Sequence, residues 1–220
     1  MKTRTLRKLE MGVRALIFSR VHQSPAGVPL AVVQLEQLLR RARELAVRQH
    51  DGRVGVRAAA ARKRELRRTI RRLHVAHLRH VARAARTELP ELWRKFVLPR
   101  GTIPYQTFRP MVELMAAEAE SHKEVLAKYG LGEEVLESLR QAMADLDEAL
   151  QEGSRARLTH VGAGAGLDAA AHRVVLLVAV VTPIYQLRFA RRPGLLAAWK
   201  SASHVDAAPR SSPQDVNPAA

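Results

Sequence analysis

Apolar residues recur at alternating three- and four-residue steps along two long stretches of this chain, and this periodicity constrains the fold more than any other feature. Such steps place side chains along one face of an α-helix, as in a coiled coil. The first seam keeps its phase through Leu35, Leu38, Ala42, Leu45, Gln49, Gly52, Val56, Ala59, Lys63, Leu66, Ile70, Leu73, His77, His80 and Ala84. The spacing predicts one long helix over about residues 30–86.

The segment His50–Asp51–Gly52 resembles a turn when it is considered alone. A loop, however, would have no reason to preserve the phase of the seam on both sides. We therefore favour a continuous helix that is weakened or bent near Gly52. The alternative is a pair of helices separated by a break at Gly52.

A second seam follows the first at an offset of 101 residues, so that Gly52 corresponds to Gly153. It runs through Leu136, Leu139, Met143, Leu146, Leu150, Gly153, Arg157, His160, Gly164, Leu167, Ala171, Val174, Val178, Val181 and Tyr185. An amphipathic helix is predicted before each seam, over 6–21 and 105–129. A short helix opened by proline and holding one Trp is predicted after each, at Pro90 and Pro193. This shared order indicates an internal duplication of about 100 residues.

The predicted fold class is all-α, since Ala and Leu dominate and aromatic residues make up 4% of the chain. We expect an elongated antiparallel bundle of four main helices with two short Pro-led helices. Residues 1–103 and 104–204 would form two related helical-hairpin halves of one domain. Breaks are expected at 24–29 and 97–104. Residues 205–220, which are rich in Pro, Ser and Ala, are expected to be a disordered tail.

The sequence lacks the motifs of the common enzyme classes. It contains no Cys, no phosphate-binding loop ending in Lys-Ser/Thr, no Gly-x-Ser-x-Gly and no His-Glu-x-x-His. The string Gly162–Gly166 is flanked by helix-forming residues and lacks the strand that a dinucleotide site requires. We therefore predict a protein that is not an enzyme and that holds no cofactor and no metal.

Three histidines, His74, His77 and His80, have a spacing that could present imidazoles to one metal ion. Arg79 and Arg83 lie beside them, and no carboxylate occurs between Glu65 and Glu88. Since cationic neighbours disfavour a bound cation, we interpret His77 and His80 as packing residues of the seam. His160 is interpreted as a polar interruption that sets helix register.

The densest charge lies in residues 53–100, which hold 15 Lys or Arg and three acids, in a chain of net charge +16. Helical spacing places many of these arginines on one face, opposite the seam. We predict a polyanion-binding stripe formed by Arg57, Arg64, Arg67, Arg68, Arg71, Arg72, Arg79 and Arg83. Such a stripe could follow a phosphate backbone.

Two alternatives to this function stay open. Residues 101–160 carry 11 acids and six Lys or Arg, so an adjacent acidic helix could neutralise the stripe. The excess of 30 Arg over seven Lys is also typical of bacterial proteins encoded by GC-rich genomes. We expect a binding protein with nucleic acid as the first partner and an acidic protein as another. The alternative is a self-assembling scaffold, a homo-oligomer with no nucleic-acid role.

The N-terminal segment has the positive charge of a signal peptide but lacks a long apolar run behind it. The longest unbroken apolar run, residues 174–181, has eight residues, whereas a spanning helix needs about 20. We therefore predict a cytoplasmic protein without membrane insertion.

Overall fold

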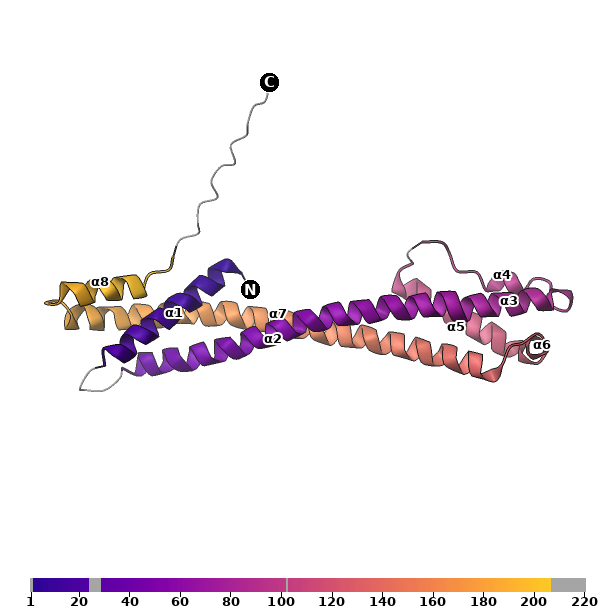
Figure 1. The fold of residues 1–220 in the computed structure, drawn as a ribbon, viewed down its shortest axis with the longest axis horizontal. Coiled ribbons are helices and arrows are strands. Elements are labelled where there is room, and N and C mark those ends of the chain that lie inside the picture. Colours follow the sequence, from indigo (N-terminus) through magenta and orange to yellow (C-terminus); the bar gives the residue numbers. More distant parts are fainter. Residues whose placement is uncertain (1, 24–28, 102, 207–220) are drawn as a thin grey trace, which may run out of the picture. The chain divides into compact units, whose positions relative to one another are not determined.

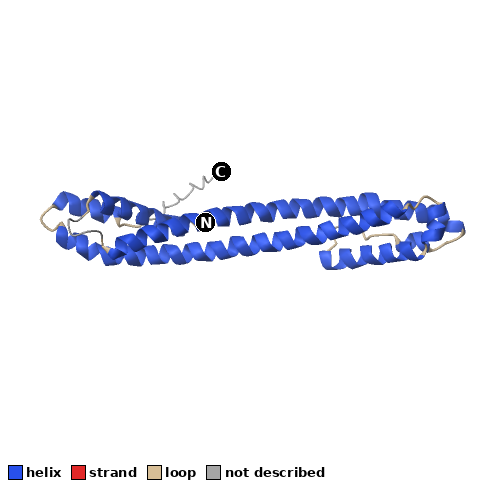
Figure 2. Ribbon diagram, turned by 90° about the horizontal axis from the view of Figure 1, so that it is seen from below, coloured by secondary structure: helices blue, strands red, loops and turns tan. Residues whose placement is uncertain are grey.

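The computed structural model describes residues 2–23, 29–101 and 103–206, and within these ranges every regular element is a helix (Figures 1 and 2). The prediction of an all-α fold is confirmed. The elements are α1 (Thr3–Val21), α2 (Leu30–Thr69), a π-helix (Ile70–Val75), α3 (Ala76–Ala84), a 3₁₀ turn (Ala85–Thr87), α4 (Leu92–Lys95), α5 (Tyr105–Ser121), α6 (Lys123–Lys128), α7 (Glu133–Arg188) and α8 (Pro193–Ala202).

Both long helices continue through their central glycines. Helix α2 passes Gly52 and α7 passes Gly153 without interruption, so the alternative of a break at Gly52 is wrong. Small residues near these positions let the helices approach closely: a Cβ built on Gly153 would lie 3.3 Å from the Cβ of Ala59. The glycines therefore serve packing between α2 and α7.

The phase of the first seam does change, at the π-helix, and this corrects the sequence prediction. A π-turn closes hydrogen bonds over five residues and so adds one residue to the helix. After Ile70 the buried positions move one place along the chain, from the predicted Leu73, His77, His80 and Ala84 to His74, Leu78, Val81 and Ala85. Leu73 is consequently 61% exposed.

The helix predicted over 105–129 is likewise corrected. It consists of two helices, α5 and α6, separated at His122, whose ψ of 19° lies outside the helical range. Gly130 follows α6 with a φ of +98°, as a helix-terminating glycine requires. The breaks predicted at 24–29 and 97–104 fall partly outside the described residues, which omit 24–28 and 102. The tail prediction lies outside them from residue 207 onward.

Residue contacts divide the chain into two compact units. The first unit comprises residues 1–51 and 159–220, and the second comprises residues 52–158. The predicted division into related halves at residue 103 stays a prediction.

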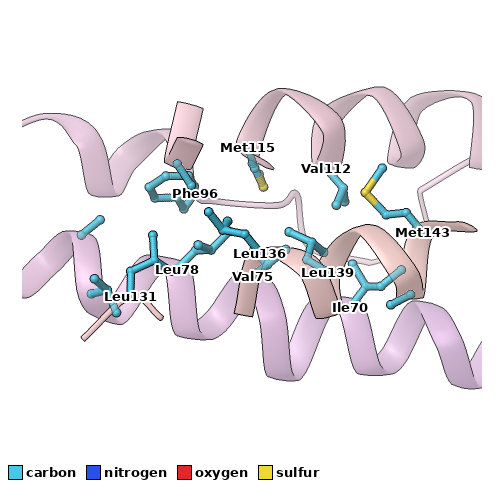
Figure 3. Close-up of a cluster of buried hydrophobic side chains, with 14 of the residues drawn as sticks. Ile70, Val75, Leu78, Phe96, Val112, Met115, Leu131, Leu136, Leu139 and Met143 are labelled. Atoms are coloured by element: carbon cyan, nitrogen blue, oxygen red, sulfur yellow. The ribbon is translucent and has the colours of Figure 1, made fainter. Parts of the chain in front are cut away.

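The core of the second unit surrounds Phe96, which is fully buried after α4. Side chains of α3, α5 and α7 contribute to it, among them Leu78, Met115 and Leu136 (Figure 3). Contacts between α2 and α7 pair Gly55 with Ala156 and Ala59 with Gly153. The numbers rise along α2 as they fall along α7, so the two helices run in opposite directions in this unit.

The first unit has its own core, built from α1, α2, α7 and α8. Its centre is an aromatic cluster in which the ring of Phe18 lies 5.3 Å from Trp199, 5.6 Å from Tyr185 and 5.8 Å from Phe189. Trp199 is 1% exposed. The predicted Pro-led helix at Pro193 therefore supplies a core anchor.

Candidate polyanion-binding site

The predicted stripe lies entirely in the second unit, on three consecutive helical segments. Helix α2 carries Arg57, Arg64, Arg67 and Arg68, the π-helix carries Arg71 and Arg72, and α3 carries Arg79 and Arg83. Five of these side chains are exposed and three are half-buried. The half-buried ones are Arg67, Arg71 and Arg79.

The acids of residues 101–160 pair mainly with cations outside the stripe. Arg62 lies 3.0 Å from Glu148 and 3.4 Å from Glu152, while Arg109 lies 3.1 Å from Asp147. Lys95, Lys123 and Arg140 hold further glutamates of this segment. Among the described residues, the one stripe arginine paired with a carboxylate is Arg68, 2.7 Å from Glu65 of its own helix. Neutralisation of the stripe by the acidic segment is thus not what the described contacts form.

Two stripe arginines hold the segment between α4 and α5. The guanidinium of Arg67 donates to the carbonyl of Ile103 and lies 4.6 Å above the ring of Phe108. Arg71 donates to the carbonyl of Pro99 at 3.3 Å. Burial, followed by the charge of Arg71, lowers the pKa of Arg67. These two side chains therefore have a packing role as well as a charge.

Three guanidinium groups surround Trp93 of α4. The Cζ atoms of Arg83, Arg94 and Arg79 lie 5.1, 5.6 and 5.9 Å from the ring centroid. Contacts of this kind orient the cations through the electron-rich face of the indole. Sequence reasoning interpreted Trp93 as part of a short helix and missed this role. The available signal was an aromatic residue within an otherwise basic stretch.

The histidines are divided by the shift of helix phase. His74 is buried, and burial together with the neighbouring His77 lowers its pKa. His77 is half-buried, and its Nε2 atom has no hydrogen-bond partner among the described residues. His80 is exposed, so its predicted packing role is wrong. Across the described ranges no three His, Asp or Glu side chains gather as metal ligands.

His160 behaves as the sequence predicted. It interrupts the apolar seam of α7, and its Nδ1 atom lies 3.0 Å from the carbonyl oxygen of Gln49 on α2. A half-buried polar contact of this kind fixes the register of two packed helices within the first unit.

These features define an all-α protein with an arginine-rich surface on α2, the π-helix and α3. Comparison with protein-family models, with curated proteins and with solved structures finds no match to the chain.

Proposed function

We propose that this chain is a non-enzymatic binding protein whose arginine stripe binds a polyanion, with nucleic acid as the first candidate. The observation that carries the proposal is the exposure of Arg57, Arg72 and Arg83 without a carboxylate partner among the described residues. Free cations on a helical face contact successive phosphates without reading sequence, and each contact releases a counterion. Binding should therefore depend steeply on salt.

Fluorescence anisotropy with labelled duplex DNA of arbitrary sequence, measured over a range of salt concentrations, tests this proposal. The variant Arg64→Gln, Arg68→Gln, Arg71→Gln and Arg72→Gln removes half of the stripe. We expect it to lower the salt slope of log affinity by about 3 to 4 units, because each lost phosphate contact removes about one. Circular dichroism should show unchanged helicity.

A matched control removes the same number of charges from the first unit, through Arg41→Gln, Arg43→Gln, Arg48→Gln and Arg191→Gln. This control should retain nearly the full slope. Absence of DNA binding by the natural protein at low salt would refute the proposal, as would equal losses in the two variants. Tighter binding of poly-glutamate than of DNA would favour an acidic protein as the partner.

A second candidate function, self-assembly, is favoured by the open face of α7. This helix contains an 18-residue window with a mean hydropathy of 1.7, of which 33% is buried, so by length and composition it could cross a membrane. One side of it packs into the first core through Val174, Val178 and Val181. Its outer side exposes Val161, Leu176, Val180, Ile184 and Leu187.

We propose that this outer face of α7 docks a second copy of the chain, because a contiguous apolar face on a soluble domain marks an interaction surface. Analytical ultracentrifugation of Leu176→Gln with Val180→Gln should show loss of any oligomer. The control Leu114→Gln alters an exposed apolar residue of α5 and should leave the oligomer intact. A monomeric natural protein refutes self-assembly. Its binding to lipid vesicles would instead assign the face to a membrane surface.

The finer architecture is also a proposal. An internal duplication is supported by the short helices that follow α3 and α7, each holding one Trp, and by the packing glycines Gly52 and Gly153. We propose that these repeats form an elongated antiparallel bundle of four main helices in the cytoplasm. Solution scattering of the full chain tests its elongation.

A further inference from the structure

A pocket of about 200 Å³ opens between α3 and the segment that follows α4. Its basic side is formed by Arg71, Arg79, His80 and Arg83. The opposite side is apolar and consists of Phe96, Val97 and Leu98, with Val75 and Ala76 beside it. None of these lining residues is an acid, so the pocket joins several cations to an apolar wall.

The arginines of this pocket are held in place while their charges stay unneutralised. Trp93 stacks against Arg79 and Arg83, and Arg71 is anchored on the carbonyl of Pro99. The Nε atom of Arg79 is buried and has no hydrogen-bond partner in the described part of the chain. A buried donor without an acceptor is costly, and an anion in the pocket would satisfy it.

The π-helix creates this arrangement. Its extra residue turns α3 so that Leu78 and Val81 enter the core, which leaves His80 outside it. Without this rotation the seam would have buried His80 together with His77. Helical segments of this type are frequent at functional sites, because the added residue re-aims the side chains that follow.

We propose that this pocket binds a terminal phosphate monoester, such as the 5′-phosphate at the end of a nucleic-acid strand. A monoester carries close to two negative charges at neutral pH, and guanidinium groups match its oxygens in a forked geometry. The apolar wall fits the carbon atoms attached to the ester oxygen. The choice of a nucleic-acid end rests on the proposed function, whereas the phosphate site itself does not.

Titration with inorganic phosphate tests the site alone. Trp93 is one of two tryptophans, so Trp199→Phe makes it the sole tryptophan reporter beside the pocket. We expect phosphate to change the fluorescence of Trp93 saturably, while chloride at matched ionic strength does not. Equal responses to phosphate and chloride, or no response to either, would overturn the proposal whatever the protein does with DNA.

Single-stranded oligonucleotides with and without a 5′-phosphate identify the source of the phosphate. We expect about tenfold tighter binding of the phosphorylated strand. Arg79→Gln with Arg83→Gln should abolish that preference, whereas the control Arg57→Gln with Arg64→Gln should weaken both strands alike. A saturable response to inorganic phosphate without strand preference would support the pocket and reject the nucleic-acid end. Retained preference in the Arg79/Arg83 variant would overturn the assignment.

Arg83→Lys keeps the charge and guards against misfolding of the double variant. It should bind phosphate more weakly than the natural protein but more tightly than the double variant, since Lys lacks the fork of Arg. Circular dichroism monitors the fold of each variant.

Discussion

At the scale of single residues, two glycines inside helices of the first unit differ in the space around them. A Cβ on Gly12 of α1 would lie 2.5 Å from Cγ1 of Val174 and 3.3 Å from Cδ2 of Leu39. Gly12→Ala should therefore lower the free energy of unfolding by about 1 to 3 kcal/mol through overpacking. Gly162 of α7 has no atom within 4 Å of such a Cβ, so Gly162→Ala should raise it by about 0.5 to 1 kcal/mol.

Urea denaturation of both variants beside the natural protein measures these opposite effects. Each change adds the same methyl group to a helix, so each serves as the control for the other. Loss of stability in Gly162→Ala that grows with protein concentration would show that a second copy covers this part of α7. Gain of stability in Gly12→Ala would contradict the close approach of α1 to α7.

Tyr105 provides a residue-scale prediction on pH. Burial, followed by hydrogen bonding of its hydroxyl to Asp147, raises its pKa to about 12. The unfolded chain loses this proton near pH 10. The stabilisation is thus fully present below about pH 10 and is lost as pH rises toward 12, because the folded state binds the proton more tightly. Tyr105→Phe should remove this part of the pH dependence.

The unfolding free energies of the natural protein and Tyr105→Phe, compared at about pH 9 and about pH 11, give the measurement. Their difference should shrink as the pH rises. Other titrating groups affect both proteins equally and cancel in this difference. A constant difference would show that Tyr105 ionises alike in the folded and unfolded states.

At the scale of helices, spacing in the sequence predicted most positions because helix geometry is local. The seams identified Leu35, Ile70, Leu139 and Val178 as buried, and the structure buries all four. The π-helix was not predictable in this way, since it satisfies packing against α5 and α7 that sequence periodicity does not contain. The exposed members of the stripe were likewise predictable, whereas the contacts of Arg67 and Arg79 involve residues far along the chain.

The π-helix leads to a prediction on deletions. Removal of the exposed Leu73 should convert the π-helix to α-helix and keep Leu78 in the core, because the deletion cancels the extra residue. Removal of the exposed Gln151 from α7, which has no π-turn, should rotate one side of that helix by about 100° relative to its core. We expect cooperative thermal unfolding for the first deletion and loss of cooperativity for the second.

Equal damage from the two deletions would contradict this interpretation of the π-helix. The phosphate site adds an independent readout. Since the deletion of Leu73 alters the direction of α3 side chains before the pocket, it should weaken the phosphate response of Trp93 even where stability is preserved. A natural phosphate response in this variant would show that the π-helix does not orient the arginines.

At the scale of the whole molecule, the described residues form two cores that share no side chain. Phe96 is fully buried in the core of the second unit, and Trp199 is 1% exposed in that of the first. Truncation of a large buried aromatic residue costs about 3 to 5 kcal/mol. Hydrogen exchange measured by mass spectrometry should therefore accelerate in α3 and α5 of Phe96→Ala, and in α1 and α8 of Trp199→Ala.

The two truncations control for each other, because each leaves the other core intact. Local acceleration means that each unit opens as its own cooperative segment. The long helices would then exchange faster in the portion that belongs to the altered unit and at the natural rate elsewhere. Uniform acceleration through all helices in both variants would instead mean that the continuous α2 and α7 couple the two cores into one cooperative fold.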